Sequence, residues 1–459
     1  MHYLKIKKIL VPVLVFCLIS AIFVYSAQAN AVTKSALVLL IAKDTSGKIL
    51  GTGTGFIVRS EGTLVTNYHV LLDAKTIEAI TFSGDRLPIK AILKVDRAKD
   101  FALLQLPKGV YSTLEVGDSD TLKNFDFLSA LGFLSDNINY LERPLDPNKK
   151  NSPKEKVMQT FGFVLGVHPQ AQPDLPFIYT TASFGPGFSG GPVVDQENRV
   201  IGIATVEGKS INLAVPINFI KPFLDTKANI SLNDLLEEDK TSKEAHYFRG
   251  NYYLYVKGDA DRATTEFQAA LKLDDSFVLA HYDLGAAYQS QGLTERAIKE
   301  YQKATSFNPS FPEGNSNLGG YYFRMKKYDL AIKHFRQAIN AYPNFIQAHS
   351  NLGAVLNKLS RSEEAIPHLK KAIQLDPEFA IGYFNLGNAH FNQGNLNEAK
   401  KSYDLAMSKG INFLSLHWNL YDLYTRQNKR LEAKQELEII LQIEPENIKA
   451  KEQMKEFAR

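Results

Sequence analysis

The stretch Gly185-Pro186-Gly187-Phe188-Ser189-Gly190-Gly191-Pro192-Val193-Val194 decides how the first half of the chain is interpreted. A serine hydroxyl is a weak nucleophile at neutral pH, so a serine that attacks a substrate needs an adjacent base. The glycines on either side of Ser189 permit a tight backbone turn and let another chain approach closely. Residues 30–225 contain only two histidines, His69 and His168, which narrows the search for a histidine base.

The surrounding residues 30–225 predict an all-β domain. They are rich in β-branched residues, and Gly, Asp, Asn and Pro clusters separate short apolar runs, as is typical of strands joined by turns. The expected strands are Ala36–Ala42, Gly55–Val58, Thr63–Thr66, Ile77–Phe82, Phe101–Leu106, Val157–Leu165, Ile178–Thr181, Val200–Thr205 and Ile211–Val215. Many short strands at this spacing favour a barrel or a sandwich, and 217–224 is expected to form a short closing helix.

Two further residues fall into a pattern with the serine. His69 follows the strand-like run in Gly62-Thr63-Leu64-Val65-Thr66-Asn67-Tyr68-His69, and Asp100 precedes the buried-strand pattern Phe101-Ala102-Leu103-Leu104. The order His, Asp, Ser on a β framework resembles the chymotrypsin-like serine peptidases, and within them the bacterial HtrA/Deg-type group. The resemblance extends to 212–218, covers most of residues 30–225, and implies two six-stranded β-barrels.

The resemblance and the chemistry of the side chains imply the same roles. Ser189 would be the nucleophile, His69 the general base and acid, and Asp100 the carboxylate that orients the imidazole. The backbone amides of Gly187 and Ser189 would form the oxyanion hole, where each donor is worth roughly 3–4 kcal/mol by mutational loss. Each residue alone has a simpler interpretation as a turn or surface residue, and Asp96 lies near Asp100. The combination, in this order, favours catalysis.

Four local features add detail to the resemblance. Phe188 stands where Asn or Asp is common before the nucleophile, and the polar segment 142–155 is interpreted as an exposed loop inserted beside the cleft. The stretch Thr181-Ala182-Ser183-Phe184 contains no acid, so a small or medium apolar side chain is expected at the cleaved position. His168 lies beside Pro169 and is interpreted as a loop residue.

A different pattern begins at residue 244. Alanines recur with a period of 34 residues, at Ala263, Ala297, Ala331, Ala365, Ala399 and Ala433. Leu-Gly pairs, an aromatic residue or leucine four places after each alanine, and closing prolines share this period. The pattern resembles the tetratricopeptide repeat and predicts stacked pairs of antiparallel helices. The expected units are 244–277, 278–311, 312–345, 346–379, 380–413 and 414–447.

These assignments give a multidomain fold class, an all-β double β-barrel followed by an all-α tetratricopeptide repeat solenoid. A charged linker is expected at 226–243, between the peptidase-like segment and the repeats at 244–447. A capping helix is expected at 448–459.

Asparagines recur in the repeats immediately before the leucine of each Leu-Gly or Leu-Tyr pair. They are Asn317, Asn351, Asn385 and Asn419. A carboxamide both donates and accepts, so a row of them would hold the backbone of an extended peptide substrate or partner. A solvated or helix-stabilising role is an equally good interpretation.

The N-terminus has the composition of a secretory signal. Three lysines at Lys5, Lys7 and Lys8 precede the apolar run 9–25, and Ala27-Gln28-Ala29 offers a cleavage site. Residues 1–29 are therefore expected to be a signal peptide, with an uncleaved membrane anchor as the alternative. An exported protein, periplasmic or extracellular, is expected.

Charge and cysteine content exclude several functions. Without residues 1–29 the formal charge falls from +4 to +1, because three lysines and no acid are removed, so bulk charge gives no support for nucleic-acid binding. The single cysteine, Cys17, lies in the same segment, so the mature chain would have neither disulfides nor thiol catalysis. We expect no cofactor and no metal.

The sequence thus favours an exported serine endopeptidase that acts on protein or peptide substrates and whose repeats bind substrates or partner proteins. The alternative is a repeat-based interaction scaffold with an inactive or latent peptidase-like domain.

Overall fold

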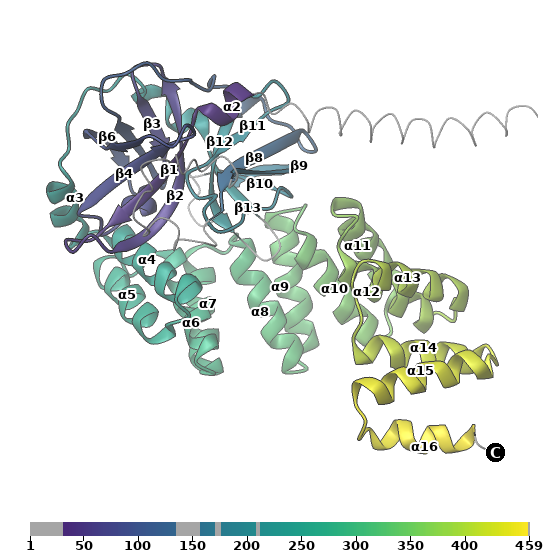
Figure 1. Ribbon diagram of the computed structural model, residues 1–459. Coiled ribbons are helices and arrows are strands. Elements are labelled where there is room, and N and C mark those ends of the chain that lie inside the picture. The colour runs from purple at the N-terminus through teal and green to yellow at the C-terminus, as the bar shows by residue number, and fades with distance from the viewer. Residues whose placement is uncertain (1–30, 135–156, 170–175, 208–211, 458–459) are drawn as a thin grey trace, which may run out of the picture. The chain divides into compact units, whose positions relative to one another are not determined.

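The computed structural model describes residues 31–134, 157–169, 176–207 and 212–457 (Figure 1). The chain divides into two compact units, one that runs to Lys257 and one that begins at Gly258, and each is described by itself. The expected signal segment and the expected loop at 142–155 lie outside the described residues.

The first unit opens with helix α2 (Ala31–Ser35) and an antiparallel seven-stranded sheet of order β5-β4-β1-β2-β3-β7-β6. Its strands are β1 (Leu37–Lys43), β2 (Ile49–Arg59), β3 (Thr63–Thr66), β4 (Thr76–Thr81), β5 (Arg86–Pro88), β6 (Ala91–Asp96) and β7 (Phe101–Gln105). The sheet has one strand more than the expected six-stranded barrel, and β5 and β6 form its edges. The 3-10 helix η1 (Tyr68–Leu71) follows β3.

Six further strands close into a barrel of order β10-β13-β12-β11-β8-β9, as expected. They are β8 (Phe127–Phe133), β9 (Val157–Pro169), β10 (Pro176–Thr180), β11 (Pro192–Val194), β12 (Val200–Glu207) and β13 (Asn212–Pro216). A short 3-10 turn, η2 (Ser119–Thr121), precedes the barrel. The closing helix expected at 217–224 is instead two 3-10 helices, η5 (Ile217–Phe219) and η6 (Lys221–Phe223), because Pro222 interrupts it.

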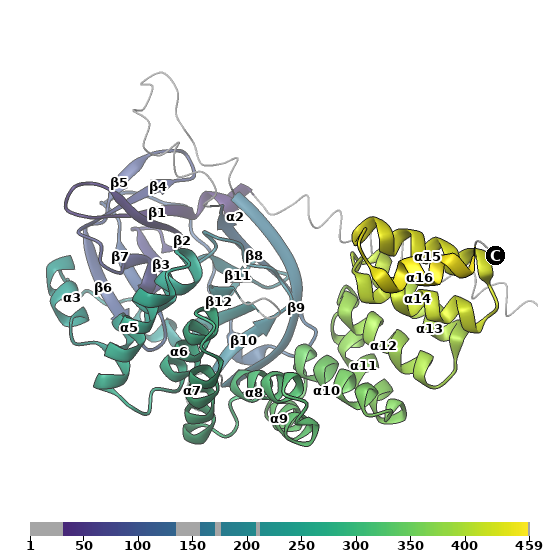
Figure 2. The ribbon, with the colours of Figure 1, turned by 90° about the horizontal axis from the view of Figure 1, so that it is seen from below.

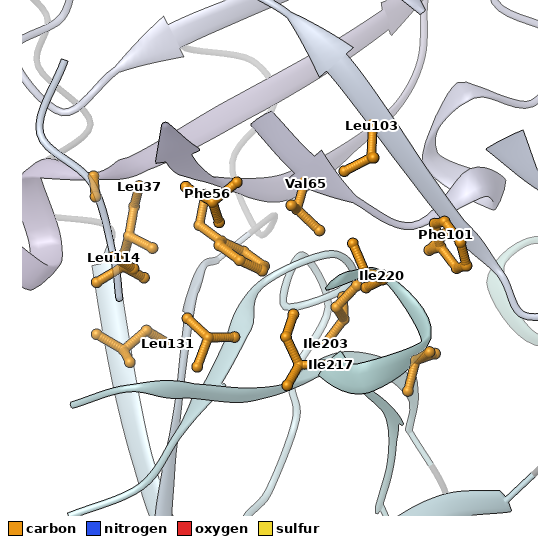
Figure 3. Close-up of a cluster of buried hydrophobic side chains, with 14 of the residues drawn as sticks. Leu37, Phe56, Val65, Phe101, Leu103, Leu114, Leu131, Ile203, Ile217 and Ile220 are labelled. Atoms are coloured by element: carbon orange, nitrogen blue, oxygen red, sulfur yellow. The ribbon is translucent and has the colours of Figure 1, made fainter. Parts of the chain in front are cut away.

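One hydrophobic core joins the sheet to the barrel (Figure 3). Phe56 and Val65 enter it from the sheet, and Leu131, Ile203 and Ile217 enter it from the barrel side, all of them buried. Burial of this much apolar surface is the main stabilising contribution to the unit. The packing holds the loops of the sheet against the loops of the barrel, where the candidate site lies.

The segment expected as a linker, 226–243, is largely structured. Ile230 pairs with Ile92 at the β6 edge of the sheet, and helix α3 (Leu232–Asp239) lies beside that edge (Figure 2). Helix α4 (Lys243–Asn251) and the π-helical turn η7 (Tyr252–Val256) follow within the same compact unit. The first expected repeat, 244–277, is therefore divided between the two units, because α4 buries its apolar residues against the sheet.

The second unit is a run of helices that follows the 34-residue period. They are α5 (Ala260–Leu273), α6 (Val278–Ser290), α7 (Thr294–Phe307), α8 (Pro312–Arg324), α9 (Tyr328–Ala341), α10 (Ile346–Lys358), α11 (Ser362–Leu375), α12 (Ala380–Asn392), α13 (Leu396–Ser408), α14 (Leu414–Arg426), α15 (Arg430–Ile443) and α16 (Ile448–Glu456). From 278 onward each expected repeat contains one helix pair, and α16 occupies the residues expected to cap the array.

The Leu-Gly glycines explain how the two helices of a repeat approach each other. A Cβ atom on Gly353 would lie 2.5 Å from Leu369, and one on Gly387 would lie 2.5 Å from Tyr403. The large residue four places after each repeat alanine thus fills the space that the glycine leaves empty, and a larger residue at these glycines would separate the helices.

A partly buried polar pair also joins the two helices of several repeats. In one repeat His334 Nδ1 lies 3.0 Å from Asn315 Oδ1, and in the next His349 Nδ1 lies 3.0 Å from His368 Nδ1. The first helix is fixed further by a bond to the preceding turn, from Asn315 to Pro309 O in one repeat and from His349 to the equivalent carbonyl in the next. Asparagine and histidine therefore fill the same structural position.

Candidate active site

The structure brings His69 and Asp100 together. His69 Nδ1 lies 2.8 Å from Asp100 Oδ2, and the backbone N–H of His69 donates to Asp100 Oδ1 at 3.0 Å. The carboxylate is buried, whereas the side chain of His69 keeps 27% of its surface exposed. An imidazole whose Nδ1 edge faces a buried carboxylate presents its Nε2 edge outward, which suits a proton acceptor.

Strand pairing and a strained backbone place Asp100. The β3–β7 register sets Thr66 opposite Ala102, which brings the residues after β3 to the start of β7. Asp100 adopts φ 53°, in the left-handed region, and Asn67 Nδ2 donates to its carbonyl oxygen at 2.7 Å. Asp96, the alternative carboxylate, bonds instead to Lys99 through its backbone N–H and its ammonium group.

Thr205 is a further partner of Asp100 that the sequence analysis missed. Its hydroxyl donates to Asp100 Oδ2 at 2.5 Å, and both residues are buried. The pairing of β12 with β13 shifts register between Ala204 and Val206, so Thr205 lies at a bulge, which redirects its side chain. A period-two reading of the strand gives no signal for such a residue.

The loop that carries Ser189 is held on strand β2. Thr54 N–H donates to Ser189 O at 2.8 Å, and Thr54 Oγ1 donates to Gly187 O at 2.6 Å. A Cβ atom on Gly190, which has φ 85°, would lie 2.1 Å from Thr54 O and 2.2 Å from Thr66 Oγ1. The serine loop of the barrel is thus fitted between β2 and the end of β3, close to the segment that carries His69.

The amides of the serine loop fall into two groups. The N–H groups of Phe188, Gly190 and Gly191 donate to the carbonyl oxygens of Gly185, Ala204 and Phe188, respectively. Among the described residues, the amides of Gly187 and Ser189 donate to no protein acceptor. These are the two amides that the sequence analysis assigned to an oxyanion hole, and Gly187 has the positive φ of 97° that favours glycine.

Phe188, which stands where Asn or Asp is common before the nucleophile, has a packing role. The ring is buried in the barrel core, parallel to Phe184 with centroids 6.5 Å apart, and its Cα lies 2.7 Å from where a Cβ on Gly132 would be. Phe188 therefore anchors the serine loop by packing.

In this structure, the hydroxyl of the candidate nucleophile, Ser189, is not hydrogen-bonded to the candidate base, His69. Within the described residues, neither the hydroxyl of Ser189 nor Nε2 of His69 makes a hydrogen bond. Catalytic hydrogen bonds commonly tighten only when substrate binds.

Two other expectations differ from the structure or gain detail. His168 lies in strand β9 with an edge contact to Tyr179, and burial lowers its pKa, so the expectation of a loop residue was wrong. Three of the four repeat asparagines bond to the preceding repeat. Asn317 Nδ2 donates to Tyr282 Oη at 3.2 Å, and Asn385 Nδ2 donates to Ser350 Oγ at 3.1 Å.

Asn419 also bonds to the preceding repeat, because its Nδ2 donates to Asn388 Oδ1 at 2.7 Å. Asn351 instead bonds within its own helix, where it accepts from Gln347, one turn earlier on α10, at 3.3 Å. Such bonds within the array favour the helix-stabilising interpretation of the ladder.

The part of the chain that the structure describes holds no cluster of three or more His, Cys, Asp or Glu side chains able to bind a metal ion. In the same residues, every helix is too short or too polar to cross a bilayer.

Family models match both units. The model described as a trypsin-like peptidase domain matches residues 53–203. Tetratricopeptide repeat models match 250–292 and 356–394, 312–345 and 380–409, and 278–311. The chain therefore carries a trypsin-like peptidase domain followed by tetratricopeptide repeats.

Curated relatives of the peptidase part are HtrA-type serine proteases. The mitochondrial serine protease HTRA2 of Drosophila virilis is 26% identical over 216 residues, which is 45% of this chain and 48% of the relative. The putative serine protease HhoB of Synechocystis sp. is 28% identical over 170 residues, 36% of this chain and 38% of the relative. The chain thus spans less than half the length of these relatives. A solved structure from a functional characterization of Pseudomonas aeruginosa pilF matches with a TM-score of 0.43 at 21% identity, over 48% of this chain and 99% of that chain.

Proposed function

We propose that this chain is a serine endopeptidase that hydrolyses peptide bonds in protein substrates. Ser189 attacks the carbonyl carbon, His69 takes the serine proton and returns it to the leaving amine, and Asp100 orients the imidazole. The observation that carries the proposal is the pair of bonds from His69 to the buried carboxylate of Asp100, at 2.8 and 3.0 Å.

The tetrahedral intermediate needs donors for its oxyanion. The amides of Gly187 and Ser189 are the donors in this proposal, because the neighbouring amides of the loop already donate to carbonyl oxygens. Amides fixed before the reaction stabilise developing charge without reorganisation. The reaction needs no cofactor and no metal.

We further propose that the repeat array binds the substrate or a partner protein. Repeat arrays present extended surfaces built from successive helices, which suit protein ligands. The signal-like composition of residues 1–29 supports export, with the chain either released or anchored by that segment.

A second candidate is a latent peptidase that becomes active only when a polypeptide binds. The open contact between Ser189 and His69 within the described residues favours this state in the unliganded chain. The inactive interaction scaffold is the limiting case of this candidate.

Labelling with a fluorophosphonate probe separates these functions. An active peptidase labels at rest, and Ser189→Ala abolishes the label. A latent peptidase labels only when unfolded protein is added. If no condition produces labelling that depends on Ser189, the chain is a scaffold and the proposed activity is wrong.

A further inference from the structure

Helix α4 lies against the segment that carries His69. The ring centroid of Phe248 is 5.8 Å from that of Tyr68, at an interplanar angle of 66°, and 5.8 Å from that of His69, at 30°. Phe248 is partly buried and packs against the core cluster that contains Tyr68, Leu71 and Ala245. An apolar ring from outside the barrel and sheet therefore lies beside the imidazole, tilted by 30° to its plane.

The next residue of α4, Arg249, forms an ion pair with Asp73, which follows the turn that carries His69. Arg249 Nε lies 3.0 and 3.1 Å from the carboxylate oxygens of Asp73, and Nη2 lies 2.8 Å from Oδ1. Paired donors on one carboxylate fix direction as well as distance. Asp73 follows His69 by four residues, so consecutive side chains of α4 contact both the histidine and the end of its turn.

Helix α3 contacts Arg97, which lies in the turn that leads to Asp100. Arg97 Nε donates to Asp239 Oδ1 at 2.7 Å, and Arg97 Nη2 donates to Glu238 Oε2 at 3.0 Å. The carboxylate of Asp239 is fully buried, and losing one member of a buried ion pair is strongly destabilising. Arg97 also accepts, through its carbonyl oxygen, the backbone N–H of Asp100. Segment 226–257 thus contacts the turns that carry both His69 and Asp100.

We propose that Phe248 is a positioning residue for His69, an inference that rests on the proposed peptidase function. The bonds to Asp100 hold the Nδ1 edge of the imidazole but leave its plane free to tilt about that edge. An aromatic ring beside the imidazole limits the tilt and so fixes the direction of Nε2. Because Phe248 carries no titratable group, it restrains the base without competing for its proton.

Position matters because proton transfer depends steeply on geometry. A displacement of about 1 Å at a reacting group costs up to about a hundredfold in rate. The proposal makes the residues after the barrel part of the peptidase machinery, although the repeat match begins at residue 250, two positions after Phe248.

The test compares Phe248→Ala with Phe248→Tyr, which keeps the ring, and with the matched control Phe127→Ala. Phe127 is also a partly buried phenylalanine packed on aromatic neighbours, on β8. All variants are made in the full chain. Two readouts are the second-order rate of fluorophosphonate labelling across pH and the downfield proton resonance of the His69 Nδ1–H···Asp100 bond.

We expect Phe248→Ala to label about tenfold more slowly and to broaden or lose the downfield resonance. Phe248→Tyr should restore both within about threefold, and Phe127→Ala should leave both unchanged although each alanine variant unfolds more readily. An unchanged rate and resonance in folded Phe248→Ala would overturn the inference. Equal losses in Phe127→Ala would also overturn it, because the effect would then be general.

The two proposals fail in different ways. If the wild-type chain never labels in a Ser189-dependent manner, the peptidase function is wrong. The resonance still decides the positioning role, because the His69–Asp100 bond exists without turnover. If the wild type labels and Phe248→Ala labels equally, only the positioning role is wrong.

Discussion

The bond from Thr205 to Asp100 gives a quantitative prediction about the candidate site. Asp100 Oδ2 accepts from Thr205 Oγ1 at 2.5 Å and faces His69 Nδ1 at 2.8 Å, while Oδ1 accepts from the backbone of His69. Thr205→Val keeps the side-chain shape and removes one of the three bonds. A hydrogen bond to a charged group contributes about 1.5–3 kcal/mol, so we expect the first unit to lose about 2 kcal/mol of unfolding free energy.

The same substitution should slow fluorophosphonate labelling about tenfold, because a carboxylate with fewer fixed donors holds the imidazole less firmly. Hydrogen exchange of peptides from β7 and β12 measures the stability, and Thr205→Ser, which keeps the hydroxyl, is the matched control. Trp418 is the sole tryptophan and lies in α14, so its fluorescence reports the repeats and should not change. Wild-type exchange and labelling in Thr205→Val would refute the assigned bond.

Three further predictions concern other parts of the chain. Gly190→Ala should reduce labelling to the level of Ser189→Ala with Trp418 fluorescence unchanged, since its Cβ would lie 2.1 Å from Thr54 O; labelling at the wild-type rate would contradict the loop geometry. Burial lowers the pKa of His349 and His368 below 6.5, so the unfolded chain binds more protons and the repeats should lose stability as the pH falls through that value. His349→Asn gives this repeat the Asn–His pair that the preceding repeat already has. The variant should reduce the slope of unfolding free energy against pH, measured in urea titrations, by at most about 1.4 kcal/mol per pH unit, and an unchanged slope would contradict this prediction. A peptide-library digest should show cleavage after small or medium apolar residues, and cleavage only after Lys or Arg would contradict this specificity.

The repeat helices could be predicted from sequence because their period is long and regular. Alanine, glycine and the large residue that faces the glycine recur together, and each helix pair has the same packing requirement. In the barrel and sheet, most expected strands lie within a few residues of the observed ones. Strands such as β5 and β11 are three residues long, too short to show an alternating pattern.

The candidate site also contains residues that the sequence could predict and residues that it could not. His69 and Asp100 stand in local motifs, and the structure brings them together. Thr205 acts from a bulge, and Phe248 reaches His69 across 179 positions of sequence, so neither has a local signal. The linker at 226–243 looked unstructured because its many charges hide Leu235 and Asp239, which are buried only when the sheet is present.

The seating of the serine loop on β2 bears on the order of events during synthesis. Thr54 belongs to an early part of the chain, whereas Gly187 and Ser189 leave the ribosome more than a hundred residues later. A chain whose sheet and barrel have not met cannot hold Ser189 against Thr54. Under the proposed peptidase function, the chain would therefore gain hydrolytic capacity only when both halves are complete, and nascent or partly unfolded chains would not cleave their neighbours.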